Sequence, residues 1–131
     1  GSGNIYAVDN GNECIRKVDP LGNVTTVAGD ATPGYIDGPG SVARFQNPTG
    51  IAVGGSGDLW VGDAFNNRLR HIDSSGIVTT VAGSGDPGVV GFVNGLGLDA
   101  RFDGPYGLAF MGGKVYIPEF SANNRIRVVT P

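Results

Sequence analysis

The chain of 131 residues repeats itself with a period of about 55 residues. The tetrapeptide Gly-Asn-Ile-Tyr at residues 3–6 returns in related form at residues 57–60 and 113–116, so the successive starts lie 54 and 56 residues apart. Repeats of this length, when they consist of short strand-like runs and turns, are typical of propellers and solenoids, whose units cannot bury their apolar faces alone. The repeat therefore predicts one structural unit built several times, and a residue that recurs in every unit is expected to build that unit.

Each unit contains a pair of strand-like segments, called B and C here. Apolar and polar residues alternate in the C segments, which is the period-two pattern of a half-buried strand. A turn that opens with Asp19 and closes with Gly22 follows the first C segment, and turns of this composition join the strands of a hairpin. The B segments are residues 4–9, 58–63 and 114–119, and the C segments are residues 12–19, 66–73 and 123–129.

Two further segments, D and A, complete the unit. Segment D has the sequence Val-Thr-Thr-Val-Ala-Gly both times, and a long Gly-rich connection with a repeated Ala-Arg-Phe sequence separates it from segment A. In chain order the segments run B-C-D, A-B-C-D and A-B-C, which predicts ten strands, or two and a half four-stranded blades. The D segments are residues 24–29 and 78–83, and the A segments are residues 48–53 and 105–110.

These interlocking motifs, together with Pro-Thr-Gly-Ile-Ala-Val at residues 48–53, resemble the NHL repeat over nearly the whole chain. The Ala-Arg-Phe sequence in the connection resembles the long-repeat version of that family. The resemblance implies a β-propeller in which segment A is innermost and segment D outermost. The chain departs from the family pattern at Cys14, where the later units have arginine, at Gly54 and at Pro118. Each departure affects a local turn contact and leaves the expected fold intact.

The expected fold class is all-β, with propeller blades of four antiparallel strands. A closed ring uses roughly four to eight blades, so about two and a half blades predict an incomplete ring or a ring completed by oligomerisation. Unpaired strand edges and exposed blade faces favour self-association. One NHL-repeat region is expected over residues 1–131, divided into units at residues 3–47, 48–104 and 105–131.

Composition narrows the classes of partner. The net charge is −3 and the sequence pI is near 4.8, whereas a nucleic-acid-binding surface needs clustered Lys and Arg, so no nucleic acid is expected. No apolar run approaches the length of a membrane span, so no membrane partner is expected either. The partners that remain are a protein, peptide or glycan ligand and further copies of the chain.

Three acids, Asp9, Asp63 and Glu119, recur at the end of segment B. Each lies close in sequence to asparagines of segment C, and Ca²⁺ takes carboxylate and amide oxygens as ligands. An aspartate at a strand end also accepts hydrogen bonds from backbone N–H groups in a turn. Because the acid recurs in every unit, we expect it to be structural and expect no cofactor, with Ca²⁺ as the alternative.

Arg44 and Arg101, each between Ala and Phe in the long connection, also recur. An anion-binding role is possible chemically, but we expect the guanidinium to fix the connection by bonding to carbonyl groups or to an acid such as Asp37 or Asp99. The phenylalanines that follow the arginines are expected to fill the gap between blades.

Four other side chains are candidates for a functional site. Tyr35 and Tyr106 do not recur, and aromatic residues at blade rims bind sugars and peptides, so we expect them to be the best ligand candidates. His71 is the single histidine and occupies a repeat position expected to be solvated, and because a catalytic histidine needs a nucleophile or a carboxylate in reach, no catalytic role is expected for it. Cys14 is expected to be a partly exposed thiol without a catalytic role.

Two hypotheses for function follow. The first is a non-catalytic NHL-type scaffold, a fragment or self-assembling piece that presents loops to a protein, peptide or glycan. The alternative is a fragment of a metal-dependent propeller enzyme, a lyase or an ester or lactone hydrolase, whose catalytic residues lie in missing blades. Residues 48–53 and 105–110 contain no His, Asp or Glu that could point toward a ring centre, which favours the scaffold.

Overall fold

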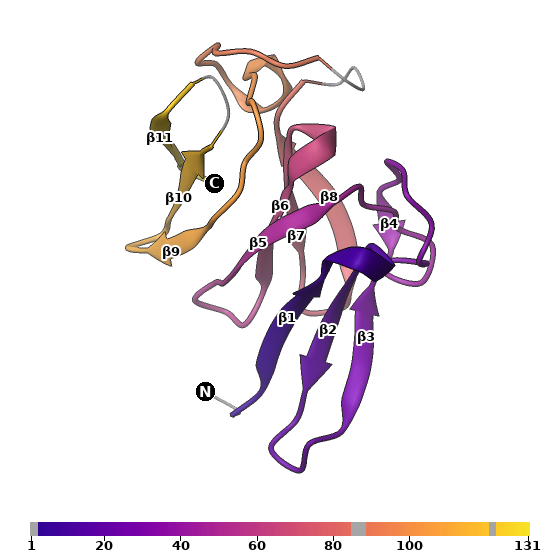
Figure 1. The fold of residues 1–131 in the computed structure, drawn as a ribbon. Helices are drawn as coiled ribbons and strands as arrows, with labels where there is room; N and C mark the ends of the chain where they lie inside the picture. The colour runs from indigo at the N-terminus through magenta and orange to yellow at the C-terminus, as the bar shows by residue number, and fades with distance from the viewer. Residues whose placement is uncertain (1–2, 85–88, 121–122) are drawn as a thin grey trace.

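The computed structural model describes residues 3–84, 89–120 and 123–131, and it is built from three antiparallel sheets that follow one another along the chain (Figure 1). The described residues contain three short 3₁₀ turns and no α-helix, so no helix among them could cross a membrane. The turns are η1 (Asn10–Asn12), η2 (Ala64–Asn66) and η3 (Gly97–Asp99). The strands are β1 (Ile5–Asp9), β2 (Cys14–Val18), β3 (Val24–Ala28), β4 (Gly38–Pro39), β5 (Pro48–Val53), β6 (Leu59–Asp63), β7 (Arg68–Ile72), β8 (Ile77–Ala82), β9 (Ala109–Met111), β10 (Lys114–Glu119) and β11 (Arg125–Val129).

The sheets confirm the predicted strand order and the all-β propeller fold. Blade 1 has the order β1-β2-β3, which corresponds to segments B, C and D, and blade 3 has the order β11-β10-β9, which corresponds to C, B and A. Blade 2 carries all four segments as β5 to β8, and the short strand β4 from the first connection adds a fifth strand outside β8. Strand β5 packs against both β1 and β9, which places segment A where neighbouring blades meet.

The first two C–D hairpins repeat each other in register. Arg16 faces Thr26 in blade 1 and Arg70 faces Thr80 in blade 2, and both hairpins have a bulge immediately before that arginine. The second A segment, in blade 3, forms a shorter strand than predicted, because β9 begins at Ala109. Pro105, which has no N–H to donate to a ladder, makes only an isolated bridge.

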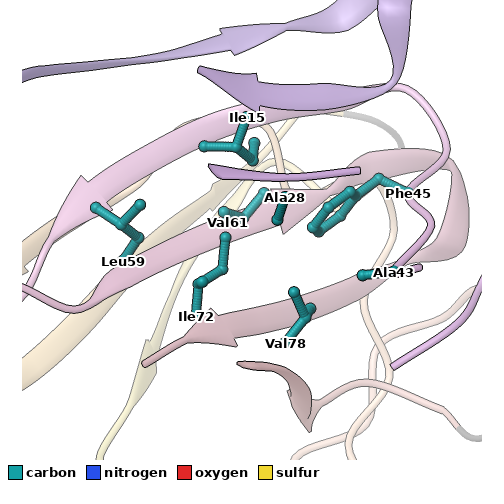
Figure 2. Packing of buried hydrophobic residues seen from close by; sticks show 8 residues of the cluster. All are labelled: Ile15, Ala28, Ala43, Phe45, Leu59, Val61, Ile72 and Val78. Carbon is teal, nitrogen blue, oxygen red and sulfur yellow. The ribbon is translucent and has the colours of Figure 1, made fainter. Parts of the chain in front are cut away.

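The hydrophobic core lies between blades. Figure 2 shows the cluster between blades 1 and 2, in which the Phe45 ring of the first connection lies among side chains of both sheets. Phe45 is fully buried, and removing a buried aromatic side chain of this kind from water contributes about 1.5–3 kcal/mol. The members are Ile15, Ala28, Ala43, Phe45, Leu59, Val61, Ile72 and Val78.

A second cluster of the same design lies between blades 2 and 3. Phe102 of the second connection takes the place that Phe45 has in the first cluster, so the two phenylalanines fill the gaps between blades as predicted. The members are Trp60, Leu69, Ala82, Phe102, Val115 and Ile117.

Candidate functional site

A buried arginine of β7 holds the first connection against blade 2. The Arg70 guanidinium donates to the Asp63 carboxylate at 2.6 Å and to the Asp37 carboxylate at 2.7 Å. It also donates to the carbonyl oxygens of Ile36 at 2.8 Å and Arg44 at 3.0 Å. Charge-assisted hydrogen bonds of this kind are about twice as strong as neutral ones. Arg70 therefore fixes an irregular segment to a regular strand.

Arg127 of β11 does the same for the second connection. Its guanidinium donates to Glu119 at 3.3 Å, to the Asn94 side chain at 2.9 Å, and to the carbonyl oxygens of Val93 and Arg101, both at 2.9 Å. The contacts correspond one by one to those of Arg70. The difference is that a neutral amide, Asn94, stands where the first connection has Asp37.

The recurring acids complete this arrangement. Asp63 accepts the Gln46 N–H at 2.8 Å, and Glu119 accepts the Asp103 N–H at 2.8 Å, so each acid holds the end of a connection. Burial raises the pKa of the Asp63 carboxyl, and the neighbouring Arg70 guanidinium opposes that shift. Within the described residues no three His, Cys, Asp or Glu side chains come together as a metal site.

Asp9 lies in a different setting, because no described connection lies against blade 1 at this position. Its carboxylate accepts the Asn12 amide at 3.0 Å and lies 4.0 Å from the Arg16 guanidinium. The Asp9 side chain is 32% exposed, whereas that of Asp63 is fully buried. The same acid is therefore a turn residue in blade 1 and the anchor of a connection in blades 2 and 3.

The arginines singled out from the sequence, Arg44 and Arg101, are the more exposed ones. Arg44 bonds to Asp30 at 2.8 Å, an acid other than the expected Asp37, and Arg101 is exposed. Their backbone carbonyls, rather than their guanidinium groups, bond to the buried arginines. The signal that sequence reasoning missed was the arginine shared by all three C segments, at positions 16, 70 and 127.

Tyr35 lies beneath an arginine. The Arg68 guanidinium carbon lies 3.4 Å from the centre of the Tyr35 ring, and Arg125 lies 3.5 Å from the Phe92 ring in the same way. Tyr35 thus has an aromatic counterpart in Phe92, 57 residues later, which the sequence analysis overlooked. A cation–π pair in each connection is a repeated structural contact, so of the two tyrosines Tyr106 is the one left free for a ligand.

Tyr106 borders a cavity of about 580 Å³ where blades 2 and 3 meet. Its ring centroid lies 5.2 Å from that of Phe120, and Phe65 stands at the same cavity. Phe65 is 60% exposed, Tyr106 42% and Phe120 75%, so three aromatic side chains face solvent around one hollow. The cavity is lined by Gln46, Ala64, Phe65, Asn66, Asn67, Val90, Asp103, Gly104, Tyr106 and Phe120.

The polar side of this cavity is held in place by the fold. Asn67 has a left-handed backbone with φ of 54°, and its side-chain oxygen accepts the Gly104 N–H at 2.9 Å. The Asn66 amide donates to the Gly34 carbonyl and to Asp63, both at 2.8 Å. The cavity therefore combines exposed aromatic rings with a fixed amide wall, which is the usual composition of a small-ligand site.

His71 and Cys14 lie away from the cavity. The Nε2 atom of His71 lies 2.8 Å from an Asp58 carboxylate oxygen, and the Ser56 hydroxyl donates to the same carboxylate at 2.6 Å. A catalytic triad requires the serine to bond to the imidazole, whereas Ser56 bonds to the acid. Cys14 is buried, not partly exposed as expected, and burial raises the pKa of its thiol. A raised pKa disfavours the reactive thiolate.

Comparison with known proteins agrees with this geometry. A model of the NHL repeat matches residues 45–72. The chloroplastic protein SUPPRESSOR OF QUENCHING 1 of Arabidopsis thaliana is 39% identical over 72 residues, which are 54% of this chain and 7% of that protein. NHL repeat-containing protein 2 of Gallus gallus is 32% identical over 107 residues, which are 81% of this chain and 15% of that protein.

Solved structures match over almost the whole chain. A structural genomics protein of Bacteroides thetaiotaomicron has a TM-score of 0.86 and 31% identity, over 95% of this chain and 32% of that one. An auxiliary nutrient binding protein of Bacteroides ovatus has a TM-score of 0.78 and 26% identity, over 94% of this chain and 33% of that one. The chain thus spans about a third of these structures and a smaller share of the curated relatives. With its strand order and connections, it belongs to the NHL-repeat β-propeller proteins.

Proposed function

We propose that this chain is a non-catalytic binding scaffold and that the cavity between blades 2 and 3 binds a neutral carbohydrate. The observation that carries the proposal is the convergence of Phe65, Tyr106 and Phe120 on one cavity. None of the three recurs one unit earlier, where the corresponding residues are Gly11, Thr49 and Ala64. Since recurring residues build the blade, three non-recurring aromatic residues at one place are better explained by a ligand.

The chemistry of the cavity favours a sugar over a charged or wholly apolar ligand. Exposed aromatic faces pack against the C–H faces of a sugar ring, and amide groups bond to hydroxyls. Among the described lining residues Asp103 is the one charged side chain, so nothing there would select an anion. The volume of about 580 Å³ lies in the range of small-ligand sites.

The similarity to known structures supports a binding role. The related protein of Bacteroides ovatus is described as an auxiliary nutrient binding protein, and its identity of 26% extends over most of this chain. A propeller places rigid strands beneath variable loops, and binding residues are concentrated on loops that a rigid scaffold positions. In this protein, the turn η2 and the end of the second connection provide residues that line the cavity.

The test is a titration of the chain with a panel of neutral oligosaccharides, observed by saturation-transfer NMR, beside short uncharged peptides. Tyr106→Thr and Phe120→Ala install the residues of the preceding unit, and each is expected to weaken oligosaccharide binding about fivefold to tenfold through the loss of one aromatic contact. Leu21→Ala removes an even more exposed apolar side chain that does not line the cavity and serves as the control. Unchanged binding in the aromatic variants, or binding of the peptides alone, would refute the proposal.

A further inference from the structure

Two adjacent asparagines, Asn66 and Asn67, form much of the polar side of the cavity between blades 2 and 3. Both residues are more than nine-tenths buried, with exposed fractions of 5% and 6%. Asn66 has an asparagine counterpart in blade 1, Asn12, whereas the residue of blade 1 that corresponds to Asn67 is Glu13. The amide at position 67 is therefore a feature in which the second junction differs from the first.

The hydrogen bonds of the fold fix the orientation of both amide groups. The Asn66 NH₂ group donates to the Gly34 carbonyl and to the Asp63 carboxylate, both at 2.8 Å, which uses both of its hydrogens and leaves its Oδ1 as an acceptor. The Asn67 Oδ1 accepts the Gly104 N–H at 2.9 Å, which leaves its NH₂ group as a donor. Among the residues that the structure describes, neither remaining group has a hydrogen-bond partner, although both residues line the cavity.

An acceptor beside a donor is the pattern that a secondary amide satisfies at its two ends. The N–H of such a group would donate to the Asn66 Oδ1, and its carbonyl oxygen would accept from the Asn67 NH₂ group. A single sugar hydroxyl would have to reach both atoms with one oxygen. Because a polar group that stays unpaired after a ligand covers it costs about 1–3 kcal/mol, a ligand that pairs both is favoured.

The apolar side of the cavity has room for the methyl group of an acetylated sugar. A sugar ring has two faces, whereas three aromatic side chains, Phe65, Tyr106 and Phe120, surround the cavity. Two of them are enough to cover both faces of a sugar ring, which leaves apolar surface for one further small group.

We propose that the cavity prefers a carbohydrate that carries an acetamido group, such as an N-acetylhexosamine, and that Asn67 determines this preference; the inference rests on the carbohydrate-binding function proposed above. Asn66 accepts the N–H of the acetamido group, Asn67 donates to its carbonyl, and its methyl group lies against an aromatic ring. At the first junction the Glu13 carboxylate accepts the corresponding backbone N–H, that of Asn47, at 2.6 Å. A carboxylate has no hydrogen to donate to a ligand, so that junction lacks this donor.

The first test compares two trisaccharides with the same linkage, the trimer of N-acetylglucosamine and the trimer of glucose, on the unchanged chain. Calorimetric titration measures both affinities, and we expect the acetylated trimer to bind about tenfold more tightly, the effect of one additional satisfied hydrogen bond. In saturation-transfer NMR the acetyl methyl signals should be the most strongly saturated ones. This comparison does not depend on the folding of any variant.

The second test replaces the donor while it keeps the fold. Asn67→Asp retains an oxygen for the Gly104 N–H and a residue type that tolerates the left-handed backbone, but it has no NH₂ group. We expect the affinity for the N-acetylglucosamine trimer to fall about tenfold and the difference between the two trimers to disappear. The matched control is Asn124→Asp, at the same position of the next unit, which is also left-handed with φ of 45° and does not line the cavity.

The outcomes separate this inference from the function on which it rests. Equal affinity of the two trimers for the unchanged chain, or a preference that persists in Asn67→Asp, would overturn the inference and leave a carbohydrate site in place. Binding of neither trimer, or binding of N-acetylated peptides alone, would overturn the inference and the proposed function together. A loss of preference in Asn124→Asp as well would also overturn it, because that residue does not line the cavity.

Discussion

Two junctions join the three blades, and their hydrophobic cores are built in the same way. The junction between blades 1 and 2 differs from the junction between blades 2 and 3 at one end. Both bury the phenylalanine of an Ala-Arg-Phe connection and both fix that connection with a buried arginine of strand C. At the first junction the end near the B–C turn is closed by polar contacts. The Glu13 carboxylate accepts the Asn47 N–H at 2.6 Å, and the Asn10 amide donates to the Pro48 carbonyl at 2.9 Å.

At the second junction the same end is open. Asn67 still accepts a backbone N–H there, so the attachment of the connection is kept. Around it, Phe65, Tyr106 and Phe120 are exposed and surround the cavity. The comparison separates two groups of residues: the recurring ones attach each connection to its blade, and the ones that differ between the junctions are those to which the proposed function assigns recognition.

The largest difference between the junctions is expected when their arginines are removed. Arg70→Met leaves the fully buried Asp63 and also Asp37 without their cation, and breaking a buried pair in this way costs about 3–5 kcal/mol. Arg127→Met affects one acid, Glu119, and the neutral Asn94, so we expect a smaller loss of about 2–3 kcal/mol. Urea denaturation measures the free energies of unfolding.

A double variant separates charge from packing at the first junction. Arg70→Met combined with Asp63→Leu removes the unpaired buried carboxylate and should recover part of the loss. Recovery remains partial because Asp63 also holds the Gln46 N–H. Equal losses for the two single arginine variants would contradict the view that the first junction is the more tightly held one.

Gly50→Ala is expected to disturb the second junction specifically. A Cβ added at Gly50 would lie 2.4 Å from the Tyr106 carbonyl oxygen and 3.0 Å from the Gly107 carbonyl carbon, so backbone atoms of blade 3 must move. Overpacking of this kind costs about 1–3 kcal/mol. It should also displace Tyr106 from the cavity, so oligosaccharide affinity should fall with stability.

The matched control is Gly107→Ala, whose added Cβ would lie 3.2 Å from the Pro118 ring. That contact is with the side chain of a strand residue in the same blade, so a smaller loss of stability is expected. Calorimetric Tm values for both variants, beside NMR titrations, make the comparison. A Gly107→Ala protein that loses as much stability as Gly50→Ala would show that the approach of blades 2 and 3 at Gly50 is not especially tight.

Sequence reasoning found the blades because strand periodicity and turn residues are local, and it found the inter-blade phenylalanines because they recur. It did not find Arg70 and Arg127 as the residues that hold the connections. They sit within ordinary alternating strands, and only the fold shows that a connection crosses them. Tyr106 could be selected from the sequence because it does not recur. Its contact with Phe120 could not be predicted, because that contact depends on the pairing of the end of β10 with the start of segment A, at Glu119 and Pro105.

The smallest effects are expected in the hairpin turns, where blades 1 and 2 do not differ. Asp19 accepts the N–H groups of Leu21 and Asn23, each at 2.9 Å, and Asp73 makes the same bonds with Ser75 and Ile77. Hydrogen bonds, first of all those from the Asn23 and Ser75 side chains, hold the pKa of both carboxyls below their ordinary value of 3.8. The carboxyl binds its proton less readily in the folded protein than in the unfolded chain. Each carboxylate therefore stabilises the fold at pH values above its ordinary pKa, and this stabilisation is lost as the pH falls through the lowered pKa of the folded state.

Asp19→Asn and Asp73→Asn should therefore lower Tm at neutral pH by a few degrees at most and by equal amounts. Each substitution should also make the decrease of Tm at acid pH less steep. Thermal scans from about pH 7 to about pH 2.5 measure both slopes. If one variant flattens the acid profile and the other does not, the two hairpins are not equivalent, and the difference between blades extends beyond their junctions.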